Sequence, residues 1–381
     1  MSILLRVLKI VGITLVSVVA VLWGMDRFQN KLPEELRGAQ DLERATIDAT
    51  IKQLVADLVE GYEGKPGPVR RDAHAKSHGC LKANFKVAEG LPDNLKVGMF
   101  ANEGSEYKAW VRFSNGAFTP RHDIKFDGRG LSLKILDTSP ETPAVASEAV
   151  AQHDFLLVNH PVFFSPNPVD YYAFVKAGVL VGRPGALERY FMPGYNPFGW
   201  RLREFVIAHE NSSREIKTPL DMQYFSMSPY AYGADQQIKY TAKRCEGSSN
   251  PFDAEIDEDD PDYLRKNLKK HLDVAPACFA LSVQVNDGSV SVEDASADWS
   301  EKKMPFNEIG YINIPQQDFA NPHNDNFCEH SDFNPGRTPK EFEPLGGINR
   351  LRTEVYTAIS AFRHERNSTP VSDPDLAWDH N

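Results

Sequence analysis

The chain contains 381 residues, of which 41% are hydrophobic and 25% are charged, so it has the composition of a globular protein and the length for a large buried core. Its formal net charge of −11 argues against nucleic-acid binding, because that function requires a basic surface. Four cysteines are too few for a disulfide scaffold, and they are compatible either with up to two disulfide bridges in an oxidising compartment or with four buried free thiols.

The first hydrophobic segment covers residues 3–23 and is interrupted only by Arg6 and Lys9. A transmembrane helix needs about 20 apolar residues, and the segment reaches that length only if both cations snorkel to the membrane surface. Two interpretations stay open: a cleaved signal peptide, or an uncleaved signal anchor within residues 1–30. We favour the anchor. Either interpretation places the body of the protein outside the cytoplasm, on the periplasmic side, and the anchor would also attach it to the membrane.

The next segments predict an α+β fold. Apolar positions near a period of about 3.6 predict a helix within residues 33–64, so residues 31–65 are expected to form a helical connector that links the anchor to the body or packs on it. Further helices are expected at 168–180, 262–271 and 340–365. Alternating patterns predict strands at the end of 69–87 and at 107–114, 131–136, 153–164, 239–242, 279–285 and 310–314. Irregularly spaced strands with inserted and appended helices favour an antiparallel β-barrel with added helices.

The C-terminal helix carries a pair of residues with possible ligand chemistry. Arg352 and Tyr356 are four residues apart and share one helix face, to which Arg363 returns two turns later. A phenol titrates near about pH 10, and a neighbouring guanidinium favours the phenolate. Such a pairing suits a tyrosinate ligand to ferric iron, and tyrosine is a known proximal haem ligand. Taken alone, the same spacing is also typical of a surface or stacking pair.

Several other motifs precede this helix in a definite order. They are Arg71-x-x-His74, Val111-Arg112-Phe113-Ser114, Gly128-Arg129-Gly130 with Lys134, Asn159-His160-Pro161-Val162-Phe163-Phe164, and Tyr171. Together with Arg352-x-x-x-Tyr356 and Arg363, this ordered set resembles the haem catalases and their smaller catalase-like relatives. The resemblance covers about residues 66–240 and 340–367. It implies a catalase-like antiparallel β-barrel with inserted and C-terminal helices around a buried haem.

The resemblance also implies a role for each residue on the distal side of that haem. His74 would be the general acid–base that moves a proton during peroxide cleavage. Ser114 would orient the His74 imidazole, and Asn159 would position the peroxide through a side-chain hydrogen bond. His78 competes with His74, because one residue more than usual separates His74 from Phe85, but the Arg71-x-x-His74 spacing favours His74.

The remaining residues implied by the resemblance would bind the cofactor. Tyr356 would be the iron ligand, with Arg352 beside it. Guanidinium groups match carboxylate geometry, so the partners of the two haem propionates would be Arg71, Arg112 and Arg363. Tyr171 would stack over the haem, and Phe163 would line an apolar pocket. No Cys-x-x-Cys-His attachment motif occurs in the sequence, so we expect non-covalent haem b.

The chain is shorter than a full-length catalase, which favours a catalase-related peroxidase with a haem domain over residues 66–367 and a tail over 368–381. The expected activity is haem-dependent reduction or dismutation of hydrogen peroxide or an organic hydroperoxide, with an unknown electron donor. Two alternatives stay open: a lipid hydroperoxide lyase or dehydratase on the same scaffold, and a non-enzymatic haem-binding protein. The oligomeric state and the preferred peroxide are left undetermined.

Overall fold

The computed structural model describes residues 33–138, 152–195, 197–212 and 215–379. The anchor predicted in residues 1–30 lies outside these ranges. Within them, no helix combines the length and apolar character needed to cross a bilayer.

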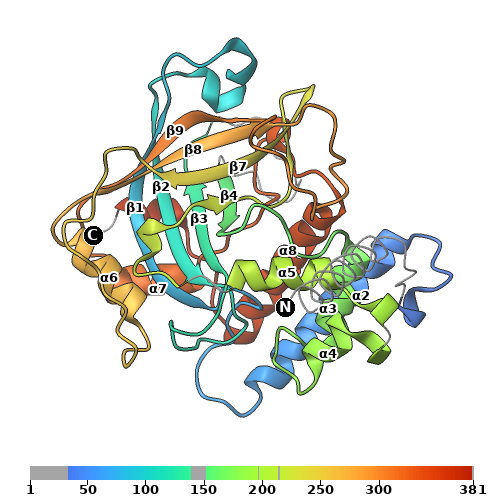
Figure 1. Cartoon of the computed structure of the whole chain (residues 1–381). Helices are drawn as coiled ribbons and strands as arrows, with labels where there is room; N and C mark the ends of the chain where they lie inside the picture. Colours follow the sequence, from blue (N-terminus) through green and yellow to red (C-terminus); the bar gives the residue numbers. More distant parts are fainter. Residues whose placement is uncertain (1–32, 139–151, 196, 213–214, 380–381) are drawn as a thin grey trace, which may run out of the picture.

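An antiparallel β-barrel forms the centre of the molecule (Figure 1). The strands follow the order β5-β4-β3-β2-β1-β9-β8-β7, and β5 also pairs with β7, which closes eight strands into a barrel; β6 extends the sheet beside β7. The α+β barrel predicted from the sequence is therefore confirmed. The strands are β1 (Lys76–Val87), β2 (Glu106–Asn115), β3 (Arg129–Ile135), β4 (His153–Val158), β5 (Tyr224–Phe225), β6 (Tyr230–Tyr232), β7 (Gln236–Arg244), β8 (Ala277–Val285) and β9 (Phe306–Ile314).

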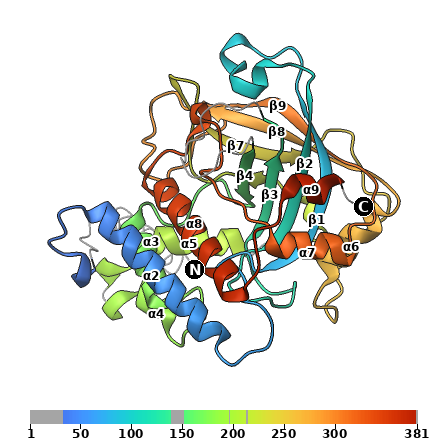
Figure 2. The same cartoon turned by 180° about the vertical axis from the view of Figure 1, so that it is seen from behind.

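Helices cover the outside of the barrel in two groups (Figures 1 and 2). The first group lies together at one side and comprises α2 (Leu42–Tyr62), α3 (Pro168–Ala177), α4 (Ala186–Phe191) and α5 (Leu202–Ser212). The second group comprises α6 (Tyr263–Leu272), α7 (Pro322–His330) and the short C-terminal α9 (Pro374–Asp379). The long helix α8 (Gly347–Asn367) connects the two, because it packs on α2 and α3 and leads back towards α7 and α9.

The helix predicted as a connector is part of the body. In α2, the apolar residues Ile47, Leu54 and Leu58 are buried in one cluster with Leu351 and Val355 of α8. These positions recur at helical spacing, so burying one stripe against α8 and α3 accounts for the helix. Of the two expectations for this segment, the structure supports packing on the body.

The four cysteines form two disulfides, which decides between the two interpretations of the sequence. Cys80 of β1 is bonded to Cys328 of α7, with 5.5 Å between the Cα atoms, and Cys245 is bonded to Cys278 of β8, with 5.4 Å between them. The first bridge closes a separation of 248 residues. A disulfide of this kind contributes on the order of 2–5 kcal/mol by restricting the unfolded chain.

A histidine is enclosed among aromatic rings inside the barrel. His153 is 1% exposed, and its ring centroid lies 4.0 Å from that of Phe155 and 5.0 Å from that of Phe342. Its Nδ1 has no hydrogen-bond partner among the described residues. Burial lowers the pKa of His153 to about 3, so its imidazole stays neutral in the folded protein at neutral pH.

We expect His153→Phe to make the stability of the protein less sensitive to acid. Unfolded histidine titrates near about pH 6.5, so below that pH the unfolded chain binds a proton that folded His153 rejects. The free energy of unfolding therefore falls as the pH is lowered from about 6.5 towards about 3, by up to about 1.4 kcal/mol per pH unit for this histidine. Denaturant titrations near pH 7 and near pH 5 measure the effect. The control is His209→Phe, because His209 is exposed. An unchanged dependence of stability on acid in His153→Phe would contradict the claim that buried His153 stays neutral.

Candidate haem site

The distal part of the candidate site is built where the chain enters β1. His74 precedes this strand and has a φ of +57°, in the left-handed region that few residues other than glycine adopt. Its backbone N–H donates to the carbonyl of Gly116 at 3.1 Å, and its carbonyl accepts from Nη2 of Arg112 at 2.7 Å. This turn places the imidazole Nδ1 3.0 Å from Oγ of Ser114 on β2. The structure thus brings together the predicted histidine and serine.

The electrostatic surroundings of His74 keep its imidazole neutral. Burial, together with the nearby positive charges of Arg112, Arg352 and Arg71, lowers its pKa to about 3. With Nδ1 bonded to Ser114, Nε2 is the ring nitrogen without a partner among the described residues. A neutral imidazole with an unengaged nitrogen can accept a proton, which is the property expected of a general base.

A glycine that the sequence motif placed only in a turn makes room for this pair. Gly130 is on β3, next to β2. A Cβ at this position would lie 2.6 Å from Cε1 of His74 and 2.9 Å from Oγ of Ser114, closer than real Cβ contacts allow. Gly130 is therefore required for the position of the imidazole, and only the folded barrel shows why.

Gly130→Ala is expected to displace the His74 imidazole. The overpacked β3 should cost on the order of 1–3 kcal/mol of stability, because neither the strand nor the paired side chains can move freely. We also expect slower peroxide turnover at equal haem content. Thermal unfolding and initial rates measure the two effects. The matched control is Gly199→Ala, whose added Cβ would have its nearest neighbour at 3.6 Å; equal behaviour of both variants would contradict the role of Gly130.

The competing histidine has a structural role. His78 lies on β1, is buried, and its Nε2 is 2.7 Å from Oδ1 of Asn115. Asn115 also accepts a hydrogen bond from Arg129, whose guanidinium donates in addition to the backbone carbonyl of Asp123 at 2.8 Å. This cluster fixes the end of β2. Its geometry supports His74, rather than His78, as the site histidine.

Asn159 has a different environment from the one expected of a residue that positions peroxide. Its Oδ1 accepts from the backbone N–H of Arg129 at 2.7 Å, and its Nδ2 donates to the carbonyl of Asn211 at 2.9 Å. The side chain is fully buried. These contacts hold the start of β3, next to Gly130. The peroxide-positioning role of Asn159 stays a prediction.

Three arginines from distant segments share one buried environment. Arg71 donates through Nη2 to the carbonyls of Cys328 and Ser331, at 3.1 Å and 2.5 Å, and Arg363 donates through Nη1 to the carbonyl of Glu329 at 2.6 Å. Each of the three guanidiniums still has a buried nitrogen without a partner among the described residues: Nη1 of Arg71, Nε of Arg112 and Nε of Arg363. Such unsatisfied donors are rare in folded proteins and indicate a missing acceptor.

The concentrated positive charge of these arginines also indicates that an anionic partner is missing. Burial lowers the pKa of Arg71, and burial with the charge of Arg71 lowers the pKa of Arg112 well below its usual range. The same two causes, in the same order, lower the pKa of Arg363 to about 9. The carboxylate of Glu329, 3.6 Å from Arg363, offsets only part of this positive charge. Bound carboxylates would satisfy both the free N–H groups and the excess charge, so the three residues fit the propionates of a haem.

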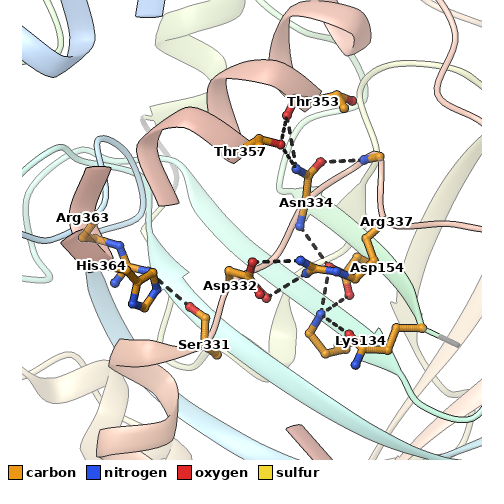
Figure 3. Close-up of polar contacts among 12 residues, drawn as sticks. Lys134, Asp154, Ser331, Asp332, Asn334, Arg337, Thr353, Thr357, Arg363 and His364 are labelled. Carbon is orange, nitrogen blue, oxygen red and sulfur yellow. Dashed lines mark hydrogen bonds and ion pairs between the residues drawn. The ribbon is translucent and has the colours of Figure 1, made fainter. Parts of the chain in front are cut away.

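A network of buried ion pairs fixes the segment whose carbonyls hold Arg71 and Arg363 (Figure 3). Asp154 of β4 accepts from Lys134 of β3 at 2.7 Å and from Arg337 at 2.9 Å, and Arg337 also pairs with Asp332 at 2.8 Å. The amide of Asn334 donates from the same segment to the carbonyl of Thr353 on α8, at 3.2 Å. The barrel thereby fixes both the arginine cluster and the helix that carries Tyr356.

The proximal residues lie on α8, as predicted. The guanidinium carbon of Arg352 is 5.9 Å from the ring centroid of Tyr356, and its Nη1 donates to Ser228 at 2.9 Å and to Asn349 at 3.1 Å. Burial acts to lower the pKa of Arg352, but the Tyr356 and Tyr230 phenols outweigh it and the pKa is raised. A guanidinium that stays charged beside the phenol suits an anionic oxygen ligand. Ser228 and Asn349 were not predicted, because hydroxyl and amide side chains carry no distinctive signal in the sequence.

Tyr171 and Phe163 form the aromatic edge of the candidate site, with ring centroids 5.6 Å apart. Burial, together with the acidic groups Asp72 and Tyr356, raises the pKa of Tyr171. Tyr171, Phe163, His74 and Tyr356 are each partly exposed, so none of these four side chains is completely enclosed by the rest of the described protein.

Comparisons with known proteins identify the class of fold. The barrel and helices match those of solved catalases: a fungal catalase at a TM-score of 0.62 and 18% identity, catalase A from Saccharomyces cerevisiae at 0.61 and 17%, and a bacterial catalase at 0.61 and 17%. The matches cover 86%, 84% and 84% of this chain, and 65%, 68% and 63% of the respective catalases.

The chain therefore has the catalase fold and spans about two thirds of the length of these catalases. No protein-family pattern matches the sequence, and no curated protein sequence matches it. At 17–18% identity the likeness establishes the fold, and the activity has to be argued from the site.

Proposed function

We propose that this protein is a haem-dependent enzyme that reduces or dismutates hydrogen peroxide or an organic hydroperoxide. The observation that carries the proposal is the cluster of three buried arginines, each with an unused N–H, beside a His74–Ser114 pair and an Arg352–Tyr356 pair. A non-enzymatic haem-binding protein would not need a neutral imidazole with an unengaged nitrogen beside the haem.

The residues present can hold haem b at defined points. Arg71, Arg112 and Arg363 would bind the propionates, and Tyr356 would bind the iron with Arg352 as its charge partner. Tyr171 and Phe163 would contact the porphyrin. The bound haem would supply the redox-active iron that the peroxide chemistry requires.

His74 would move the proton during cleavage of the O–O bond. Its lowered pKa keeps the ring neutral, and in the tautomer in which Nδ1–H donates to Ser114, Nε2 would take the proton from the peroxide oxygen that stays in the site and return it to the oxygen that leaves. Ser114 holds Nδ1 and so fixes the direction in which Nε2 points. Gly130 leaves room for this geometry.

The proposed location is outside the cytoplasm, on the outer face of the membrane. Two disulfides support this part of the proposal, because such bonds persist in oxidising compartments and are rare in the cytosol. The apolar run of residues 3–23, with Arg6 and Lys9 near its start, supports an N-terminal anchor.

The test is product analysis with the haem-loaded protein. Hydrogen peroxide is added in an oxygen electrode, with and without a phenolic reductant, and a fatty-acid hydroperoxide is added in parallel. Oxygen release means a catalase, and consumption that depends on the reductant means a peroxidase; both support the proposal. A rearranged fatty-acid product without a reductant means a lyase or dehydratase and would overturn it. Bound haem without any peroxide consumption would show a haem-binding protein instead.

A further inference from the structure

A continuous series of aromatic rings leads from the candidate haem site towards α4. Tyr171, at the edge of the site, is stacked with Phe174 at a centroid distance of 6.3 Å. Phe174 meets Tyr190 edge-on at 5.1 Å. Phe164 bridges the first step, because it lies 6.2 Å from Tyr171 and 4.6 Å from Phe174. Only one ring therefore separates the two tyrosines.

The series continues from Tyr190 to the protein surface. Phe191 lies 4.8 Å from Tyr190 and 5.3 Å from Phe205 of α5. Phe205 is 47% exposed, so the outer ring is open to solvent. We call the rings from Tyr171 through Phe174, Tyr190 and Phe191 to Phe205 the aromatic path.

Tyr190 differs from its neighbours because it is paired with a buried carboxylate. It is 1% exposed, and its hydroxyl donates to Oε2 of Glu204, which is 2% exposed. The Ser165 hydroxyl lies 3.2 Å from the hydroxyl oxygen of Tyr190. The Arg201 guanidinium is 4.4 Å from the Tyr190 ring centroid and is neutralised by Asp170 at 3.1 Å and by Glu204 at 3.6 Å.

Packing alone does not explain this arrangement. A phenylalanine would fill the same apolar space, and burying a carboxylate costs several kcal/mol unless it is paired. A phenol bonded to a carboxylate has a specific chemical property: when the phenol loses an electron, its proton has an acceptor within hydrogen-bond reach. Such a tyrosine can pass single electrons without releasing its proton to solvent.

We propose that the Tyr190–Glu204 pair relays electrons along the aromatic path from a reductant at the α5 surface to the haem site. The inference rests on the proposed peroxide-reducing function. In each step Tyr190 gives one electron, through Phe174 and Tyr171, to the peroxide-oxidised haem, while its phenolic proton passes to Glu204. A surface phenol or hydroquinone then gives one electron to the Tyr190 phenoxyl, and the proton returns from Glu204.

The overall reaction balances in atoms and electrons. Two phenolic O–H groups give two electrons to the path and release two protons to solvent at the α5 surface, and two protons taken from solvent at the haem site complete the conversion of one hydroperoxide to an alcohol and water. The reductant is a one-electron donor of the phenol or hydroquinone class, because the path passes single electrons and its exposed end is an apolar ring at Phe205. A reductant at this surface does not have to enter the haem site.

The test is electron paramagnetic resonance of the haem-loaded protein, frozen soon after peroxide is added without a reductant. Wild-type protein should show a tyrosyl radical that disappears when hydroquinone is added. Tyr190→Phe should lose this signal and oxidise hydroquinone more slowly. The matched control is Tyr172→Phe, because Tyr172 also donates to a carboxylate, Glu35 at 2.7 Å, but is not on the aromatic path. The same radical in Tyr190→Phe as in wild type would overturn the inference.

A second variant keeps the test decisive if Tyr190→Phe does not fold. Glu204→Gln preserves the shape of the side chain and removes the proton acceptor, so the radical should be lost or strongly diminished. An undiminished radical in Glu204→Gln would count against the relay. Failure of the proposed function looks different, because wild-type protein would then neither bind haem nor consume peroxide. If wild-type protein consumes peroxide, and all variants match it in the tyrosyl radical signal and in the rate of hydroquinone oxidation, the relay is wrong while the proposed function stands.

Discussion

His74→Gln is expected to lower peroxide turnover by about 10²–10⁴-fold while haem remains bound. The substitution removes the nitrogen that accepts and returns the proton, and it keeps a polar side chain of similar reach beside Ser114. Initial rates of peroxide consumption at equal haem content measure the effect. Haem content separates this catalytic loss from a binding defect, because none of the residues proposed to hold the haem is altered.

The matched control for this variant is His78→Gln. His78 is buried on β1, the strand that follows His74, and is bonded to Asn115, so its replacement is expected to affect stability and to leave turnover per bound haem close to that of wild type. Turnover in His74→Gln equal to that of His78→Gln would show that His74 is not the acid–base of the site.

Tyr356→Phe is expected to lose the haem or to bind it at least about 100-fold more weakly. Even the hydrogen-bond partners of a metal ligand contribute about 10–100-fold to affinity, and a direct ligand contributes more. Any haem that remains should lack the charge-transfer bands of ferric tyrosinate. Haem titration followed by absorption spectroscopy measures both effects.

Tyr263→Phe is the control, because the hydroxyl of Tyr263 on α6 donates to the carbonyl of Ile216, and neither residue is among those proposed to hold the haem. Removal of this hydroxyl changes one buried hydrogen bond and no proposed ligand. An unaltered spectrum and haem content in Tyr356→Phe would mean that the iron is bound by another residue.

Arg71, Arg112 and Arg363 would be unexpected in a protein that binds no cofactor, because each has a buried N–H group without a partner among the described residues. A buried charge without a partner is strongly destabilising, yet Arg112 is 2% exposed, and within the part of the chain that the structure describes its guanidinium donates one hydrogen bond, to the His74 carbonyl. The three guanidiniums donate to backbone carbonyls, and the carboxylate of Glu329 is paired with one of them, Arg363, at 3.6 Å. Their positions are fixed by the Cys80–Cys328 disulfide and by the Lys134–Asp154 ion pair. Such a costly arrangement is explained if an anionic cofactor completes it.

The sequence predicted the long elements of the barrel and missed the short ones. Strands such as β1 and β2 have enough residues for an alternation of apolar and polar side chains to appear, whereas β5 has two residues and β6 has three. The helices α4 and α5 were also missed; α4 has only six residues, and α5 presents the apolar residues Phe205 and Val206 to solvent. The fourth predicted strand was too long, because β4 ends at Val158 and the Pro161 region forms a loop.

The candidate site was predictable where its residues occur in compact local motifs. His74 and Ser114 were found from such motifs, as was the pair on α8, and the structure brings them into the expected contacts. The need for Gly130 was not predictable, because it depends on the side chain of a residue on another segment. The backbone contacts of Asn159 were not predictable either, since Arg129 and Asn211 approach it only in the folded barrel.

The most direct measurement is titration of the full-length, haem-free protein with ferric haem, followed by absorption spectroscopy. The account predicts a saturable Soret band at one haem per chain, with the high-spin features of ferric tyrosinate that Tyr356 would produce. A chain that binds no haem to saturation, or binds it with the spectrum of a different ligand, would contradict the account and remove the basis for each proposed role.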